Sequence, residues 1–212
     1  MDAFASDRVF SSIDRMARYS CANQPDIAIW NMAQLATSLV PLMPDAEAAV
    51  ERFTTMLHKM KDHLRAEWLA VFSEKLGISQ PDVEDGALIA DLLDLMETGG
   101  SDFTNTFAAF THGSAIDEIT DRVAYDAWHH RWSNRIKDEN DPKALMARRN
   151  PVIIPRNHRI EQMITAAVEG DFAPFHRLNA ALQTPFEDCE GFDDLKRPPS
   201  TEEIVPATFC GT

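Results

Sequence analysis

Apolar residues recur at helical spacing along most of this chain, and the least polar stretch runs from Pro25 to Met43. No residue after Asp26 in that stretch is charged, and apolar side chains cover nearly the whole circumference of the helix that the pattern predicts. Pro25 and Asp26 suit the first turn of such a helix. Because a helix that is apolar on almost every side belongs inside a bundle, the pattern predicts a central, buried helix with Trp30 in the core.

Amphipathic segments follow this helix, each bounded by proline, glycine or a capping residue. They predict further helices at about 45–75, 79–98, 102–110, 121–137, 142–149, 155–169 and 171–182. Alternating runs of β-branched residues, which strands require, are few. The sequence therefore predicts an all-α, multi-helix bundle, with an extended stretch at 1–24, a helical domain at 25–183 and an irregular acidic tail at 184–212.

Composition and charge narrow the range of partners. The chain has 20 Lys and Arg against 34 Asp and Glu, a formal net charge of −14 that repels nucleic acid and anionic membranes. The apolar stretch at 25–43 is short, contains amides and hydroxyls, and is cut by Pro41 and Pro44, which argues against a membrane span. Three cysteines without C-x-x-C spacing, and no export signal, favour the cytoplasm. We expect no nucleic-acid or membrane partner.

Motifs that would carry catalysis are not found in the sequence. It contains no G-x-S-x-G elbow, no phosphate-binding P-loop and no G-x-G-x-x-G, and its seven histidines lack metal-ligand spacing. Glu139 and Asp141 form a carboxylate pair, but such pairs in loops are usually solvated. No catalytic, nucleotide-binding or metal-binding residue is therefore predicted.

The segment Arg156-Asn157-His158 follows Pro155 at a predicted helix start. An arginine and the N–H groups of a helix N-terminus can together hold an anion. Alternatively, Arg156 and Asn157 lock this turn to neighbouring backbone carbonyls, and His158 meets Glu161 one turn on. Both interpretations, an anion site and a structural turn, remain open at this point.

Cys210 lies in Phe209-Cys210-Gly211-Thr212, at the C-terminal end of the sequence. A thiol near an exposed terminus is chemically accessible. The sequence leaves open whether it has a redox role or none.

Several segments resemble a known family. FSSIDRMARYSCANQP, IAIWNMAQLATSLVPLM, KLG, Asp102-Phe103-Thr104 and NPVIIPRNHRIEQMITAAVEGDFAPFHRL occur in this order, before a Pro-Pro tail ending in TFCGT. They resemble the C-terminal part of the selenoprotein O family, also called YdiU, whose members are kinase-like (pseudokinase) protein adenylyltransferases. The resemblance spans essentially the whole chain but less than half of a family member.

The resemblance implies a function that depends on residues outside this sequence. Family members bind ATP and Mg²⁺ and transfer AMP to Ser, Thr or Tyr hydroxyls of proteins. Their nucleotide-binding lobe, catalytic base and metal-binding residues all precede the residues matched here. The chain alone is therefore expected to bind no cofactor and to be inactive, with the missing kinase-like N-terminal portion, or another protein, as its partner.

The resemblance also assigns parts and residues. The first stretch, with Asp14, Arg18 and Tyr19, corresponds to the activation-segment side of a kinase-like lower C-lobe, and the later helices to the family's helical extension. Ala17 stands where the family usually has Gly. Cys210 matches the near-terminal Cys or selenocysteine, which in some members pairs with an activation-segment cysteine; Phe10 stands at that position here, so a bridge would need Cys21.

Two hypotheses follow. The chain is either the C-terminal helical part of a selenoprotein O-like adenylyltransferase, or a free-standing, non-catalytic helical module that binds or regulates another protein. Both predict an exposed apolar patch around Met1 to Tyr19, where the missing lobe or another partner would pack.

Overall fold

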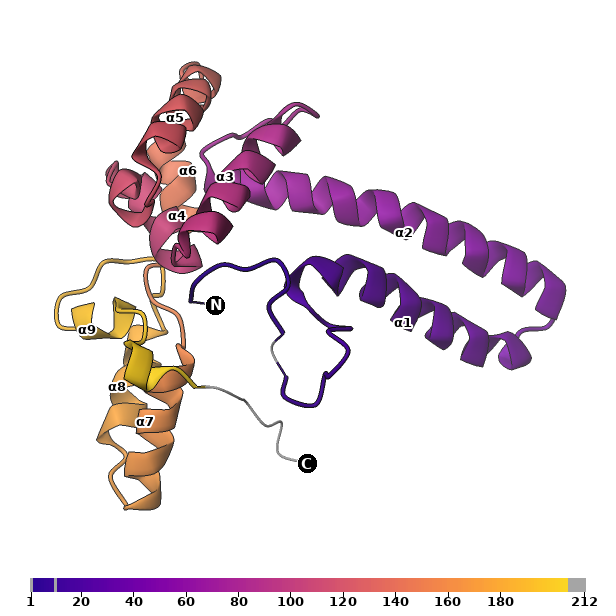
Figure 1. Cartoon of the computed structure of the whole chain (residues 1–212). Helices are drawn as coiled ribbons and strands as arrows, with labels where there is room; N and C mark the ends of the chain where they lie inside the picture. Colours follow the sequence, from indigo (N-terminus) through magenta and orange to yellow (C-terminus); the bar gives the residue numbers. More distant parts are fainter. Residues whose placement is uncertain (1, 10, 206–212) are drawn as a thin grey trace. The chain divides into compact units, whose positions relative to one another are not determined.

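The computed structural model describes residues 2–9 and 11–205 (Figure 1). Within these residues the regular structure is helical and there is no β-strand, although an isolated antiparallel bridge joins Ala3 to Asp102. The predicted all-α fold is confirmed. The chain divides into two compact units: one combines Met1–Phe4 with Val71–Pro206, and the other contains Ala5–Ala70.

The Ala5–Ala70 unit holds the helix that the apolar pattern singled out. It forms as α1 (Gln24–Leu39), after the turn η1 (Cys21–Asn23) and before the turn η2 (Val40–Leu42). Pro25 lies in its first turn, as predicted, because proline there gives up an N–H that has no partner within the helix.

The predicted burial of α1 is wrong for this chain. Ile27 is its buried residue, whereas Trp30 is 46% exposed. The uncharged pattern requires a covering surface somewhere, but within the unit the main packing neighbours of α1 are the short turns η1 and η2. Replacing Trp30 with Ala therefore costs much less stability than a core tryptophan would.

The long helix α2 (Ala46–Lys75) begins and ends where the sequence predicts. Asp45 precedes it, and its Oδ1 accepts hydrogen bonds from the amides of Glu47 and Ala48, both at 3.0 Å. Beyond its end, Gly77 has φ +81° and lies so near Pro142 that a Cβ there would be 2.8 Å from the proline Cβ. Both the conformation and the close approach require glycine.

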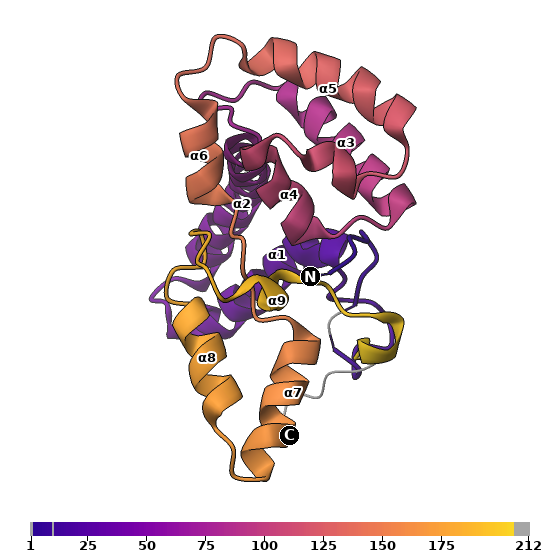
Figure 2. The same ribbon diagram turned by 90° about the vertical axis from the view of Figure 1, so that its left-hand side faces the viewer.

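The core of the larger unit is built from short helices: α3 (Asp85–Gly99), α4 (Phe103–His112), η3 (Ala115–Glu118), α5 (Arg122–Ile136) and α6 (Pro142–Arg149). Figure 2 shows α3 alongside α5, which is one of the main helix contacts of the unit. Asp102 caps α4, Asp121 caps α5 and Asp141 caps α6, each through a carboxylate oxygen that accepts an amide three residues on. These helix starts confirm the predicted ones.

Aromatic rings fill this core. Phe110 lies 5.5 Å from Trp128 and 5.2 Å from Trp132, measured between ring centroids. The indole N–H of Trp128 donates to the Leu88 carbonyl at 2.8 Å, and that of Trp132 donates to the Leu76 carbonyl at 2.9 Å. Because both indoles are buried with their N–H groups satisfied, they fix α5 to α3 and to the end of α2.

The last part of the chain forms a helical hairpin and a tail. The hairpin consists of α7 (Asn157–Val168) and α8 (Ala173–Ala181), which pack together (Figure 1). The tail was predicted to be irregular but contains α9 (Asp193–Lys196) and the turn η4 (Thr201–Glu203). Leu195 of α9 is buried with Ile153, Leu178 and Ala181, so a small apolar cluster holds the tail against the hairpin.

Candidate functional site

Arg156 lies at the centre of a buried polar cluster in the larger unit. It is the residue before α7, and its side chain is 1% exposed. Its Nη1 donates to Asp102 Oδ2 at 2.7 Å and its Nη2 donates to Asp102 Oδ1 at 3.1 Å. This two-pronged contact ties the start of α7 to the residue that caps α4.

The same guanidinium holds the N-terminal segment. Nη1 also donates to Asp2 Oδ1 at 2.5 Å, and Nη2 to Asn105 Oδ1 at 2.9 Å. Backbone bonds add to this: the Phe4 amide donates to the Ser101 carbonyl, and the Phe103 amide to the Asp2 carbonyl, both at 2.9 Å. Arg156 thus fixes residues 2–4 against the start of α4.

Electrostatics favour a charged Arg156. Burial would lower the pKa of Arg156, but hydrogen bonds and charge from Asp102, and then from Asp2, outweigh it and raise the pKa. Nearby, burial raises the pKa of Glu118, and the negative charges of Asp102 and Asp117 add to that effect. The positive charge of Arg156 is engaged by carboxylates of the chain itself, which leaves little of it for an external anion.

The hydrogen bonds of Arg156 differ from those predicted for a structural turn. Its side chain donates to two carboxylates and to a side-chain amide oxygen, and not to nearby backbone carbonyls, and Asn157 is exposed. His158 is 3% exposed, and neither ring nitrogen has a hydrogen-bond partner in the described structure, so the predicted contact with Glu161 is not made. His158 is buried although Glu161 and Gln162, the next residues on its side of α7, are exposed.

The His158 environment predicts acid-sensitive stability. Burial, and then the positive charge of Arg159, lowers the pKa of His158 below its ordinary 6.5. The unfolded chain takes up a proton near pH 6.5 that the folded chain resists, so this contribution to stability is complete above that pH. It is lost as pH falls through the lowered pKa. Urea midpoints measured from about pH 8 to about pH 5 are expected to drop less for His158→Phe than for wild type. Parallel curves would contradict this assignment.

The activation-segment-like residues form a turn in the Ala5–Ala70 unit. Asp14 Oδ1 accepts from the Arg18 amide at 2.9 Å, and Asp14 Oδ2 accepts from the Tyr19 amide at 2.7 Å. The Arg18 guanidinium carbon lies 3.9 Å from the centroid of the Trp30 ring. This cation–π contact joins the turn to α1.

Ala17 occupies a conformation in this turn that favours glycine. Its φ is +53°, in the left-handed region that costs an L-residue about 1–2 kcal/mol. The resemblance implies glycine at this position, and the left-handed conformation would suit that residue. We expect Ala17→Gly to stabilise this unit by about 0.5–1 kcal/mol, because relief of strain exceeds the entropy that glycine loses. Thermal melting checks this, with Ala22→Gly as the control that is expected to destabilise.

The candidate redox residues are only partly covered by the structure. Cys210 lies outside the described residues, as does Phe10. Cys21 is half-buried, and its amide donates to the Arg8 carbonyl at 2.9 Å. Cys189 Sγ lies 3.5 Å from Thr184 Oγ1. A Cys21–Cys210 bridge therefore stays a prediction.

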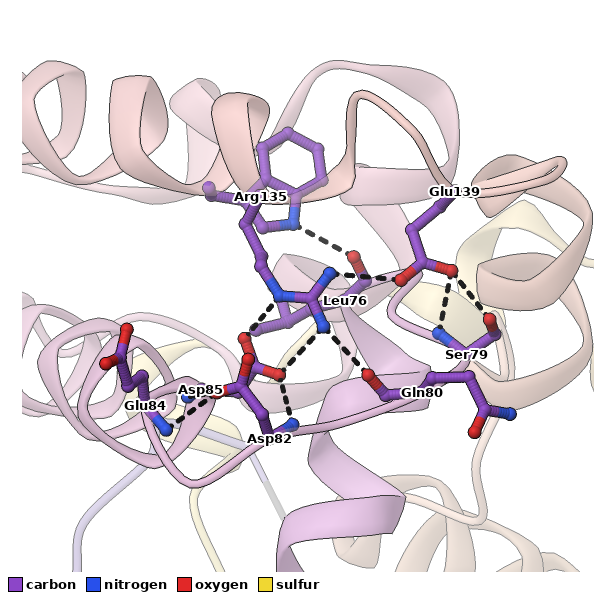
Figure 3. A network of polar contacts seen from close by, with 9 residues as sticks. Leu76, Ser79, Gln80, Asp82, Glu84, Asp85, Arg135 and Glu139 are labelled. Atoms are coloured by element: carbon purple, nitrogen blue, oxygen red, sulfur yellow. Dashed lines mark hydrogen bonds and ion pairs between the residues drawn. The ribbon is translucent and has the colours of Figure 1, made fainter.

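A second polar network was missed by the sequence analysis (Figure 3). Arg135 donates to Asp85 Oδ1 from Nε at 2.8 Å and to Oδ2 from Nη2 at 3.0 Å, and it also binds Glu139. Glu139, predicted to be a solvated loop carboxylate, instead accepts from the Ser79 hydroxyl at 2.6 Å and from its amide at 3.1 Å. Burial would raise the pKa of Glu139, but the bonds from Ser79 and Arg135 outweigh it and lower the pKa. This network fixes the loop between α2 and α3 to the end of α5.

A cavity of about 370 Å³ opens between α3 and α5. Its charged lining consists of Asp91, Asp94, Asp121 and Arg131, and Arg131 is already paired with Asp91 at 2.6 Å. An acidic lining of this kind repels the negatively charged phosphates of a nucleoside triphosphate. Across residues 2–9 and 11–205, no group of three or more His, Cys, Asp or Glu side chains is arranged to hold a metal ion. The described helices also include none with the length and apolar character to cross a membrane.

Comparisons with known proteins identify the family. The model of the family described as "Protein adenylyltransferase SelO" matches residues 1–183. The chain is 52% identical over 212 residues to the "Protein nucleotidyltransferase YdiU" of Ruegeria sp. (strain TM1040), and 52% identical to that of Ruegeria pomeroyi (strain ATCC 700808 / DSM 15171 / DSS-3). Each match covers 100% of this chain and 45% of the relative. The protein of the same name from Agrobacterium fabrum (strain C58 / ATCC 33970) is 41% identical over 224 residues, 46% of its length. This chain, which spans less than half the length of these relatives, belongs to the SelO family.

Proposed function

We propose that this chain is the C-terminal, non-catalytic helical part of a SelO-type protein adenylyltransferase. In the reaction of the family, a protein hydroxyl attacks the α-phosphorus of ATP, the bond to the β-phosphate breaks, and pyrophosphate leaves. The observation that carries the proposal is the match itself: relatives named nucleotidyltransferases match along this whole chain and extend well beyond it. The chain would correspond to the lower C-lobe and helical extension of the kinase-like fold.

The residues of this chain do not fit the cofactors of that reaction. ATP and Mg²⁺ need phosphate-cradling groups and metal-binding carboxylates, and phosphoryl transfer relies almost entirely on them. The sequence has no phosphate-binding loop, and the cavity between α3 and α5 is acidic. The guanidinium of Arg156 is already bound by the carboxylates of Asp2 and Asp102. These residues would therefore carry no catalytic step, and ATP–Mg²⁺ would bind the portion of the family protein outside this chain.

The structural role proposed for this chain is to position its N-terminal segment. Arg156 and Asp102 hold residues 2–4 against α4, inside the larger helical unit. Since the resemblance puts the metal-binding motif just upstream of those residues, the Arg156 cluster would anchor the end of the catalytic core on the helical extension. The alternative, a free-standing helical module in the cytoplasm, would need a different partner.

Calorimetry tests the proposal directly. We expect titration of ATP–Mg²⁺ into the purified chain to show no saturable binding in the micromolar range, because the binding groups are absent from its sequence. Adding the same nucleotide to a full-length relative provides the positive control. Micromolar affinity of this chain for ATP–Mg²⁺ would overturn the proposal.

A further inference from the structure

An uncharged apolar stripe runs along one face of α1. It consists of Met32, Leu35 and Leu39, spaced three and four residues apart, so that all three lie on the same side of the helix. They are 42%, 49% and 38% exposed, and Leu42, just beyond the helix, is 76% exposed. No charged side chain interrupts the sequence from Ile27 to Met43.

This stripe has the character of a surface that becomes buried. Soluble proteins rarely leave contiguous apolar faces open to water unless the faces bind a partner. The neighbouring hydroxyls are already satisfied inside the helix: Thr37 Oγ1 donates to the Ala33 carbonyl at 2.9 Å, and Ser38 Oγ to the Leu35 carbonyl at 2.7 Å. Covering this part of α1 would therefore leave few polar groups without partners.

The length of the relatives indicates what covers the stripe. The family match extends over residues 1–183 and so includes α1, while more than half of each Ruegeria relative lies outside the match. A second copy of this chain is disfavoured, because each copy carries a net charge of −14 and two copies repel each other.

We propose that the Met32–Leu35–Leu39 stripe is the docking surface for an uncharged apolar segment in the part of the SelO-family polypeptide that this chain does not contain. The inference rests on the proposed function and names the surface through which the two parts combine. Burial of three half-exposed apolar side chains, together with Leu42, would supply the apolar centre of such an interface.

The test measures binding between the purified chain and the part of the Ruegeria pomeroyi relative that the match leaves uncovered. Leu35→Glu places a charge in the centre of the stripe, and Gln34→Glu places the same charge on the exposed polar side of the same helix. We expect Leu35→Glu to raise the dissociation constant at least about tenfold, and Gln34→Glu to raise it less than about twofold. Both wild-type side chains are exposed, so we expect both variants to fold. Circular dichroism of each variant checks this.

The possible outcomes separate this inference from the proposed function. If the wild-type chain binds and Leu35→Glu binds equally well, the docking surface is wrong while the proposed function stands. If the wild-type chain does not bind the remainder at all, both fail. If sedimentation shows that the wild-type chain dimerises and that Leu35→Glu abolishes the dimer without weakening the complex with the remainder, the occupant is a second copy and the inference is overturned.

Discussion

Replacing Arg156 with Met is expected to destabilise the larger unit by about 3–5 kcal/mol, because it leaves buried Asp102 without its ion-pair partner. The side chains of Arg156 and Asp102 are 1% and 7% exposed, so water cannot replace the lost cation. The Asp2 carboxylate loses its partner as well, and we expect the amide of Phe4 to exchange its hydrogen faster. The free energy of unfolding is measured by urea titration with circular dichroism.

Arg131→Met provides the matched control. Arg131 pairs with Asp91 at 2.6 Å, but these side chains are 53% and 47% exposed, and such surface pairs contribute at most about 1 kcal/mol. Arg156→Lys is expected to fall between the two, since it keeps the charge but cannot donate to both oxygens of Asp102 in the same plane. Equal losses for Arg156→Met and Arg131→Met would show that the cluster does not hold the fold together.

The second large effect is expected for Trp128→Ala. Trp128 is 1% exposed, packs on Phe110 and Trp132, and donates to the Leu88 carbonyl at 2.8 Å. Its removal leaves a cavity and deletes the hydrogen bond to the Leu88 carbonyl, and we expect a loss of about 3–5 kcal/mol in the free energy of unfolding. Chemical denaturation followed by far-ultraviolet circular dichroism measures it.

Trp30→Ala is the comparison that checks the revised position of α1. Trp30 is nearly half-exposed and contacts Arg18, so we expect a loss of about 1 kcal/mol, well below that of Trp128→Ala. If Trp30→Ala were as costly as Trp128→Ala, α1 would be a core helix of the isolated chain after all.

Features fixed by neighbouring residues were predicted well from the sequence. Asp45, Asp102, Asp121 and Asp141 each cap the helix that follows them, because a cap needs only residues within the first turn. Asp82 shows the limit of such signals: its carboxylate accepts the amide of Glu84 at 2.7 Å, and the turn that results delays α3 until Asp85.

Features that depend on distant residues were not predicted. Arg156 binds Asp2 and Asp102, which are 154 and 54 positions away, and no local pattern links them. Glu139 is fixed by Ser79, 60 positions away. Val123 has the helical spacing of a core residue but is 81% exposed, because periodicity identifies a face and not what covers it. The same reason explains the wrong prediction for α1.

Transfer of labelled AMP from ATP to a protein acceptor tests most directly whether this chain is the non-catalytic part of a SelO-type adenylyltransferase. It compares this chain alone, the uncovered part of the Ruegeria pomeroyi relative alone, and the two mixed. We expect no incorporation by the chain alone, and more incorporation by the mixture than by the other part alone. Incorporation by the chain alone, or a mixture no more active than the other part, would contradict it.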